Sequence, residues 1–97
     1  MQTVYLDFET FYDTHYTLTK MSTAQYINHE DFHVWGVGIK FEDEDTEWYG
    51  ATEATDILEQ IDWSNTALVC HNTLFDAFIL TRHYGLTPKY YYDTAAM

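Results

Sequence analysis

Residues 66–72 (TALVCHN) constrain the fold more than any other segment of this chain. The run is short and almost wholly apolar, which is the pattern of a strand buried on both faces of a sheet. A helix signal precedes it, with Thr52 as the expected N-cap. A second helix signal follows it (NTLFDAFILTRHYG) and ends at Gly85. Together with the strand candidate at 89–93, this order predicts parallel strands joined by helical crossovers.

The amino-terminal half predicts strands with shorter connections. Residues 3–8 and 32–41 both alternate between apolar and other side chains, and the acidic turn at 42–45 (EDED) leads into a third strand candidate, TEWYG. Residues 10–31 are polar and mixed, and they predict an excursion with one short helix at 22–27, capped by Ser22. The alternation of the second strand predicts one face made of His33, Trp35, Val37, Ile39 and Phe41.

These elements predict an α/β fold built on one mixed sheet with flanking helices. Three early strands with short turns pair most simply as an antiparallel meander. The two later strands return through helices, so they can lie parallel to the first strand and beside it. At 97 residues, 46% of them hydrophobic, the chain is expected to form a single domain.

Charge and composition exclude several classes of protein. The chain has four Lys and Arg against 16 Asp and Glu, a formal net charge of -12, so a freestanding nucleic-acid binder is not expected. No apolar run is long enough to span a bilayer, and acids stand where a signal peptide needs basic and apolar residues. With a single cysteine, the chain is expected to be a soluble cytoplasmic protein without a membrane partner.

Three carboxylates are expected to lie near one another. Asp7 and Glu9 share one face of the first strand, and Asp76 falls in the first turn of the helix that follows the buried strand. Acids brought together near a core repel one another and lose hydration, so they need raised pKa values or bound cations. Mg²⁺ or Mn²⁺ would suit such oxygen ligands. The alternative, that Asp7 and Glu9 only line a solvent-exposed strand face, stays open.

Two motifs carry a resemblance to a known family. LDFET resembles the first motif, and HNTLFDAFIL the second, of the DEDD (DnaQ-like) 3′–5′ exonucleases on the ribonuclease H-like fold. The segments LTKMSTAQYI and HYGLTPKYYYDTAAM are similar to the amino-terminal proofreading exonuclease domain of bacteriophage family A DNA polymerases. The resemblance covers essentially the whole chain. It implies that residues 1–97 form a single, partial ribonuclease H-like exonuclease domain that acts on the 3′ end of single-stranded DNA.

The resemblance also implies roles for individual residues. Asp7, Glu9 and Asp76 would be the catalytic ligands of two Mg²⁺ or Mn²⁺ ions, with Asp7 shared by both ions and Glu9 on the ion that activates water. Thr10, Asn72 and Phe75 would be substrate-binding: Thr10 through its backbone amide, and Asn72 through contact with the substrate or by capping the helix. Phe75 is also expected to pack.

The sequence departs from the family pattern in one respect. The family has a fourth aspartate on a later helix, and the sequence is expected to stop before it; for Asp93 we favour a structural or capping role. The chain alone is therefore expected to be weak or inactive as an enzyme, and to work with the remainder of a DNA polymerase chain. The alternative function is a non-catalytic ribonuclease H-like module that binds a polymerase, another protein or a second copy of itself. Zinc, serine-nucleophile and phosphate-loop patterns are missing from the sequence.

Overall fold

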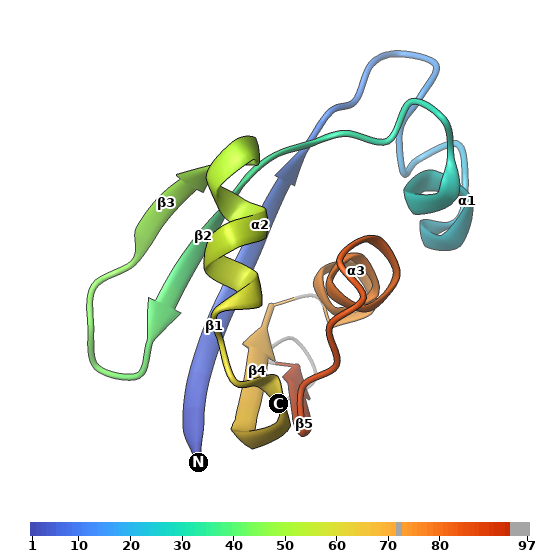
Figure 1. Ribbon diagram of the computed structural model, residues 1–97. Coiled ribbons are helices and arrows are strands. Elements are labelled where there is room, and N and C mark those ends of the chain that lie inside the picture. Colours follow the sequence, from blue (N-terminus) through green and yellow to red (C-terminus); the bar gives the residue numbers. More distant parts are fainter. Residues whose placement is uncertain (72, 94–97) are drawn as a thin grey trace.

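A computed structural model describes residues 1–71 and 73–93, without the side chains of residues 73 and 74 (Figure 1). Its centre is a five-stranded sheet with the order β3-β2-β1-β4-β5. β2 runs antiparallel to β1 and β3, whereas β4 is parallel to β1 and β5. The mixed sheet expected from the sequence is therefore confirmed, with β1 in the middle. The strands are β1 (Gln2–Thr10), β2 (Val34–Phe41), β3 (Glu47–Gly50), β4 (Thr66–Cys70) and β5 (Tyr90–Asp93).

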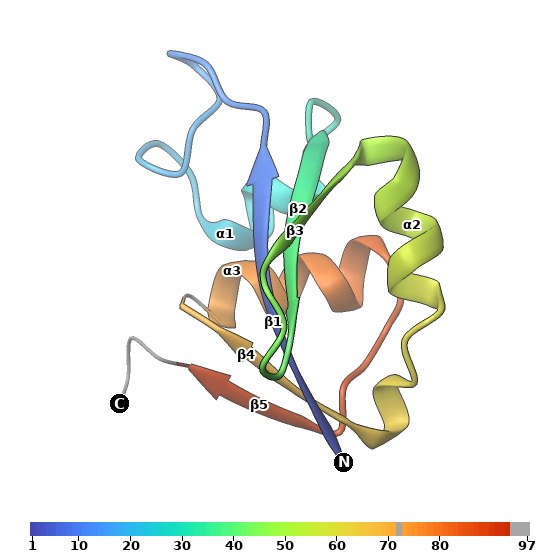
Figure 2. The same cartoon turned by 90° about the vertical axis from the view of Figure 1, so that its left-hand side faces the viewer.

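The helices lie on one side of this sheet. Figure 2 shows α2 and α3 behind and beside the strands, with α1 next to α3, and the opposite face of the sheet free of helices from the described residues. No helix in the described ranges is long and apolar enough to cross a membrane. The helical segments are α1 (Thr23–Asn28), α2 (Ala51–Glu59), the 3-10 turn η1 (Trp63–Asn65), α3 (Thr73–Phe78) and the π-helical turn η2 (Ile79–His83), which continues α3.

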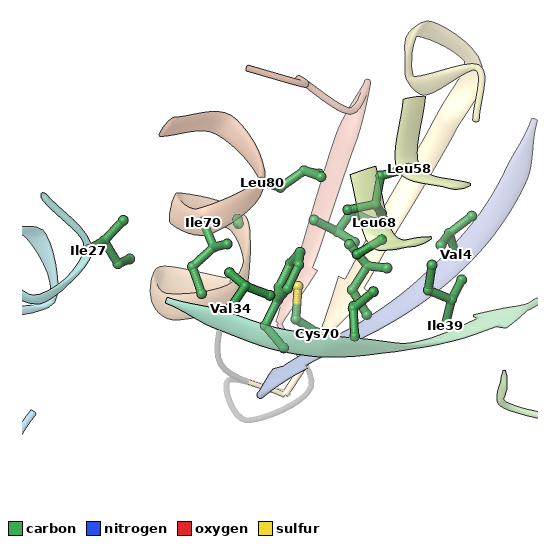
Figure 3. Close-up of a cluster of buried hydrophobic side chains, with 14 of the residues drawn as sticks. Val4, Ile27, Val34, Ile39, Leu58, Leu68, Cys70, Ile79 and Leu80 are labelled. Atoms are coloured by element: carbon green, nitrogen blue, oxygen red, sulfur yellow. The ribbon is translucent and has the colours of Figure 1, made fainter. Parts of the chain in front are cut away.

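The hydrophobic core fills the space between the sheet and these helices (Figure 3). Every residue of β4 is buried, as its apolar sequence predicts. Each fully buried aliphatic side chain contributes roughly 1.5–3 kcal/mol of transfer free energy, so this layer is the main source of stability. The largest fully buried side chains include Val4, Val37, Ile39, Leu58, Leu68, Ile79 and Leu80.

A β-bulge changes the expected pattern at the start of β2. Glu9 pairs with Gly36, but the next residue, Thr10, pairs with Val34. Trp35 is therefore an extra residue, and such a residue reverses which positions point inward. Val34 is 4% exposed and Trp35 is 50% exposed. The prediction that Trp35 shares a face with Val37 and Ile39 is wrong for this reason, whereas Val37 and Ile39 do lie on the same, buried face.

Local signals explain most helix ends. Ser22 caps α1 as expected: its hydroxyl accepts a hydrogen bond from the amide of Gln25 at 3.2 Å, and the Gln25 side chain accepts one from the Ser22 amide at 3.0 Å. α2 begins earlier than expected, with Gly50 rather than Thr52 at its N-cap, because β3 passes directly into the helix without a loop. After η2, Gly85 adopts a positive φ of 70°, which ends the helical segment.

Candidate metal and nucleic-acid site

Asp76 lies where α3 meets the edge of β1. β4 pairs with β1 only along residues 2–5, so α3, which follows β4, reaches the next part of that edge. There Oδ1 of Asp76 accepts a hydrogen bond from the backbone amide of Phe8 at 3.1 Å. Asp76 is 4% exposed. The Asp76 carboxylate therefore accepts a hydrogen bond from a β1 amide that lies beyond the end of the pairing with β4.

The environment of Asp76 favours its protonated form. Burial raises the pKa of Asp76 to about 7, because desolvation penalises the ionised carboxylate. The hydrogen bond from the Phe8 amide acts in the opposite direction, and the negative charges of Asp7, Glu9 and Asp93 raise the pKa further. Four carboxylates thus interact electrostatically at one end of the sheet.

Asp7 and Glu9 lie on the helix-free face of the sheet. Both are exposed, while Leu6 and Phe8 are buried, as the alternation of β1 predicts. Asp76 reaches the backbone between the two acids, but α3 approaches from the other face. Within the described ranges, no group of three or more His, Cys, Asp or Glu side chains is arranged to hold a metal ion. The structure therefore brings Asp76 to the segment that carries Asp7 and Glu9 without gathering all three carboxylates at one point.

The donor chemistry of these residues suits a hard divalent cation. Carboxylate oxygens are the ligands that Mg²⁺ and Mn²⁺ prefer, and positive charge would offset the repulsion around Asp76. Asp7 and Glu9 are exposed on the opposite face, so their oxygens would have to turn toward the edge of β1 to share an ion with Asp76. Asp76 is already fixed there by its hydrogen bond to Phe8.

A cavity of about 300 Å³ adjoins Glu9. Glu9, Thr10 and Phe75 line it, so two of the expected substrate-binding residues share a cavity with one expected metal ligand. The hydroxyl groups of Thr10 and Tyr26 share a hydrogen bond of 2.8 Å, and the Tyr26 ring centre lies 6.1 Å from that of Phe75. The remaining lining residues are Phe8, Tyr12, Thr17, Leu18 and Tyr26. The third expected substrate-binding residue, Asn72, lies outside the described residues.

Sequence reasoning missed Tyr26 as a contributor to this region, and it gave Asp93 a structural or capping role without placing it near Asp76. Tyr26 belongs to the excursion at 10–31, whose mixed sequence has no period that assigns an inward face; the Ser22 cap, which fixes the start of α1, was the only available signal. Asp93 ends β5 and pairs in register with Cys70 at the end of β4. Because the carboxyl ends of parallel strands share one edge, the expected parallel pairing already pointed to its proximity to Asp76.

Comparison with known proteins does not identify a family for this chain. The chain matches no protein-family model, no curated protein and no solved structure.

Proposed function

We propose that the chain carries the metal-binding carboxylates of a 3′–5′ exonuclease with a ribonuclease H-like fold, and that Asp7, Glu9 and Asp76 bind Mg²⁺ or Mn²⁺. The observation that carries the proposal is the hydrogen bond from the Phe8 amide to Asp76, which holds a buried carboxylate against the strand segment bearing two exposed ones. The negative charges of Asp7 and Glu9 raise the pKa of Asp76, and a bound cation would offset this repulsion.

The sheet supports the proposal because it has the arrangement that the resemblance implies. The first three strands form an antiparallel meander, and β4 and β5 lie parallel to β1. The motif LDFET ends β1, and HNTLFDAFIL spans α3 and the first residues of η2. The two motifs are far apart in sequence but meet at the hydrogen bond between Phe8 and Asp76.

The lining of the cavity beside Glu9 is suited to a nucleotide substrate. Its lining combines aromatic rings with the hydroxyl of Thr10, a surface on which the terminal base of a single strand can stack. The net charge of -12 opposes binding of a long DNA backbone. We therefore assign only the 3′-terminal nucleotide to this chain, and the surface that holds the rest of the strand to another part of a polymerase.

Asp7, Glu9 and Asp76 would hold two divalent ions, and these would supply activation of a water molecule and stabilisation of the leaving oxygen of the phosphodiester. The residues of the chain have positioning roles in this scheme. Asp76 is held by the Phe8 amide, and Asp7 and Glu9 alternate outward from the same strand. Thr10 follows Glu9 directly and is anchored by Tyr26, so the wall of the cavity is fixed relative to the acids.

Mn²⁺ binding tests the assignment directly. The free Mn²⁺ signal in electron paramagnetic resonance gives the affinity at a pH of about 8, where Asp76 is ionised. We expect Asp7→Ala, Glu9→Ala and Asp76→Asn each to weaken binding by about tenfold or more. Asp56→Asn, an exposed acid on α2, is the matched control and should bind as the wild type does. Equal affinity in all five proteins would refute the metal assignment.

Hydrolysis of a 5′-labelled DNA single strand tests the reaction. We expect shortening from the 3′ end to be slow, to require Mn²⁺ or Mg²⁺, and to disappear in Asp7→Ala. Hydrolysis that continues unchanged in Asp7→Ala would show that the activity does not depend on this centre.

A further inference from the structure

The helix-free face of the sheet carries a row of side chains that crosses four strands. In a sheet, paired positions on neighbouring strands point to the same face. Tyr5 pairs with Lys40 on β2 and with Val69 on β4, and Val69 pairs with Tyr92 on β5. Tyr5 is exposed and alternates with the buried residues Val4 and Leu6, so this row lies opposite the core.

Two neighbouring rows extend the same surface. Gly38 pairs with Trp48 on β3 and with Asp7 on β1, which places Trp48 on this face. Ala67 pairs with Tyr90 on β5. We call the set Tyr5, Trp48, Tyr90 and Tyr92 the aromatic face. The exposed fractions of these four residues are 39%, 56%, 45% and 45% in that order, and no helix in the described ranges covers them (Figure 2).

Two members of the aromatic face, Trp48 and Tyr5, pack against neighbouring residues of β2. A Cβ atom at Gly36 would lie 2.3 Å from Cζ2 of Trp48, so the indole rests directly on the glycine backbone. Lys40 Nζ lies 4.7 Å from the centre of the Tyr5 ring. Rigid aromatic anchors lose little entropy on binding, and Trp and Tyr are the residues that most often dominate protein interfaces.

The same face of the sheet also contains a cavity. Its volume is about 260 Å³, and its lining includes Tyr5, Gly38, Lys40 and Thr46. Because Gly38 places no side chain over the sheet, the space beside Tyr5 is open to an incoming apolar side chain.

Charge selects the kind of partner. The turn at 42–45 (EDED) is exposed and joins the two strands that carry Lys40 and Trp48, and the chain as a whole has a net charge of -12. Two copies of such a chain repel one another, and so do the chain and a nucleic acid. A segment rich in Lys and Arg is attracted instead.

We infer that the aromatic face docks a cationic amphipathic segment of another protein, with an apolar side chain in the cavity beside Tyr5 and Lys or Arg side chains against the turn at 42–45. None of the four aromatic residues is assigned to metal or nucleotide binding, but the cavity beside Tyr5 is also lined by Asp7, one of the proposed metal ligands. The peptide experiments below are therefore done without added divalent metal.

Two synthetic amphipathic peptides with the same leucine positions test the inference, one with lysine and the other with glutamate at every polar position. We expect the lysine peptide to bind and to shift the indole N–H resonance of Trp48, and the glutamate peptide not to bind. Trp48→Ala and Tyr92→Ala should each lower the affinity for the lysine peptide by about tenfold. Tyr12→Ala is the control: Tyr12 is exposed but lines the other cavity, so affinity should not change.

Replacing the turn acids tests the electrostatic part. A triple variant carrying Asp43→Asn, Glu44→Gln and Asp45→Asn should bind the lysine peptide with lower affinity. The dependence of this affinity on salt concentration should also be smaller. Equal binding to wild type and Trp48→Ala would mean that charge alone attracts the peptide, and would overturn the inference. The inference would also be overturned if the lysine peptide did not bind, or if the glutamate peptide bound equally well. A stable dimer in sedimentation that Trp48→Ala dissociates would overturn it too, because the face would then bind a second copy of the chain. Circular dichroism establishes that each variant is folded.

Discussion

The backbone amide of Phe8 donates a hydrogen bond to Oδ1 of Asp76 at 3.1 Å, across a sequence separation of 68. This contact joins the central strand to the helix that follows β4. It also fixes a buried carboxylate where like charges surround it, so its ionisation works against folding. Asp76→Asn keeps the shape and an acceptor oxygen but removes the charge, which makes it the most direct probe of the site.

The pH dependence of stability should report Asp76. Its pKa rises from 3.8 to about 7 on folding, so the folded chain binds an extra proton between these values. The stabilisation from the protonated form is fully present below the unfolded pKa and is lost as pH rises through about 7. Relative to Asp76→Asn, the unfolding free energy of the wild type should fall by up to about 4 kcal/mol over this range. Urea unfolding at a series of pH values measures both proteins, and parallel curves would contradict the expectation.

Addition and removal of divalent metal should change stability above neutral pH. At a pH of about 8, Mn²⁺ at about 100 times its Kd should raise the unfolding free energy of the wild type by about 2.7 kcal/mol, and EDTA should reverse the effect. Thermal unfolding with and without metal measures it. Asp76→Asn should gain less, because it lacks one ligand, while Asp56→Asn should respond as the wild type. An equal gain in Asp76→Asn would place the ion elsewhere.

Asp93 should set part of the pKa of Asp76. Asp93→Asn removes one of the negative charges that raise it, so the pKa of Asp76 should fall. Carbon-13 resonances of the carboxyl groups, followed through a pH titration, measure the shift. Asp56→Asn is again the control, and an unchanged titration of Asp76 in Asp93→Asn would mean that the two groups do not interact in solution.

Gly36 should not tolerate a side chain. A Cβ atom there would lie 2.3 Å from Trp48 Cζ2 and 2.5 Å from the carbonyl oxygen of Tyr49, so Gly36→Ala should destabilise the chain by about 1–3 kcal/mol. Gly50→Ala is the matched control, since no atom lies within 4 Å of an added Cβ atom there. Chemical denaturation compares the two. A larger loss from Gly50→Ala would show that the contact with Trp48 does not decide the effect.

Period and turn chemistry were sufficient to predict the sheet but not its local irregularities. The alternation of residues 3–8 and the apolar run at 66–72 predicted β1 and β4 because burial repeats with the geometry of a strand. The bulge at Trp35 arises from pairing with another strand, which a period within one strand does not encode. The early start of α2 at Ala51 has a similar cause, since Gly50 is both the last residue of β3 and the N-cap of α2.

The candidate site was predicted in part for a related reason. Asp7, Glu9 and Asp76 follow from strand period and from the position after a parallel strand, and the structure brings Asp76 to the backbone of Phe8. The contact of Tyr26 with Thr10 depends on the path of the excursion at 10–31, which is fixed by tertiary packing and not by local sequence.

The central position of β1 affects the order in which a nascent chain can fold. β1 leaves the ribosome before both of its neighbours. The antiparallel neighbour is complete only at Phe41, and the parallel neighbour only at Cys70. Until then one edge of β1 has unpaired amides and carbonyls, which can pair with strands of other chains. Stalling of translation between these two points would therefore produce an aggregation-prone intermediate, and protection of that edge by a chaperone would matter most in this interval.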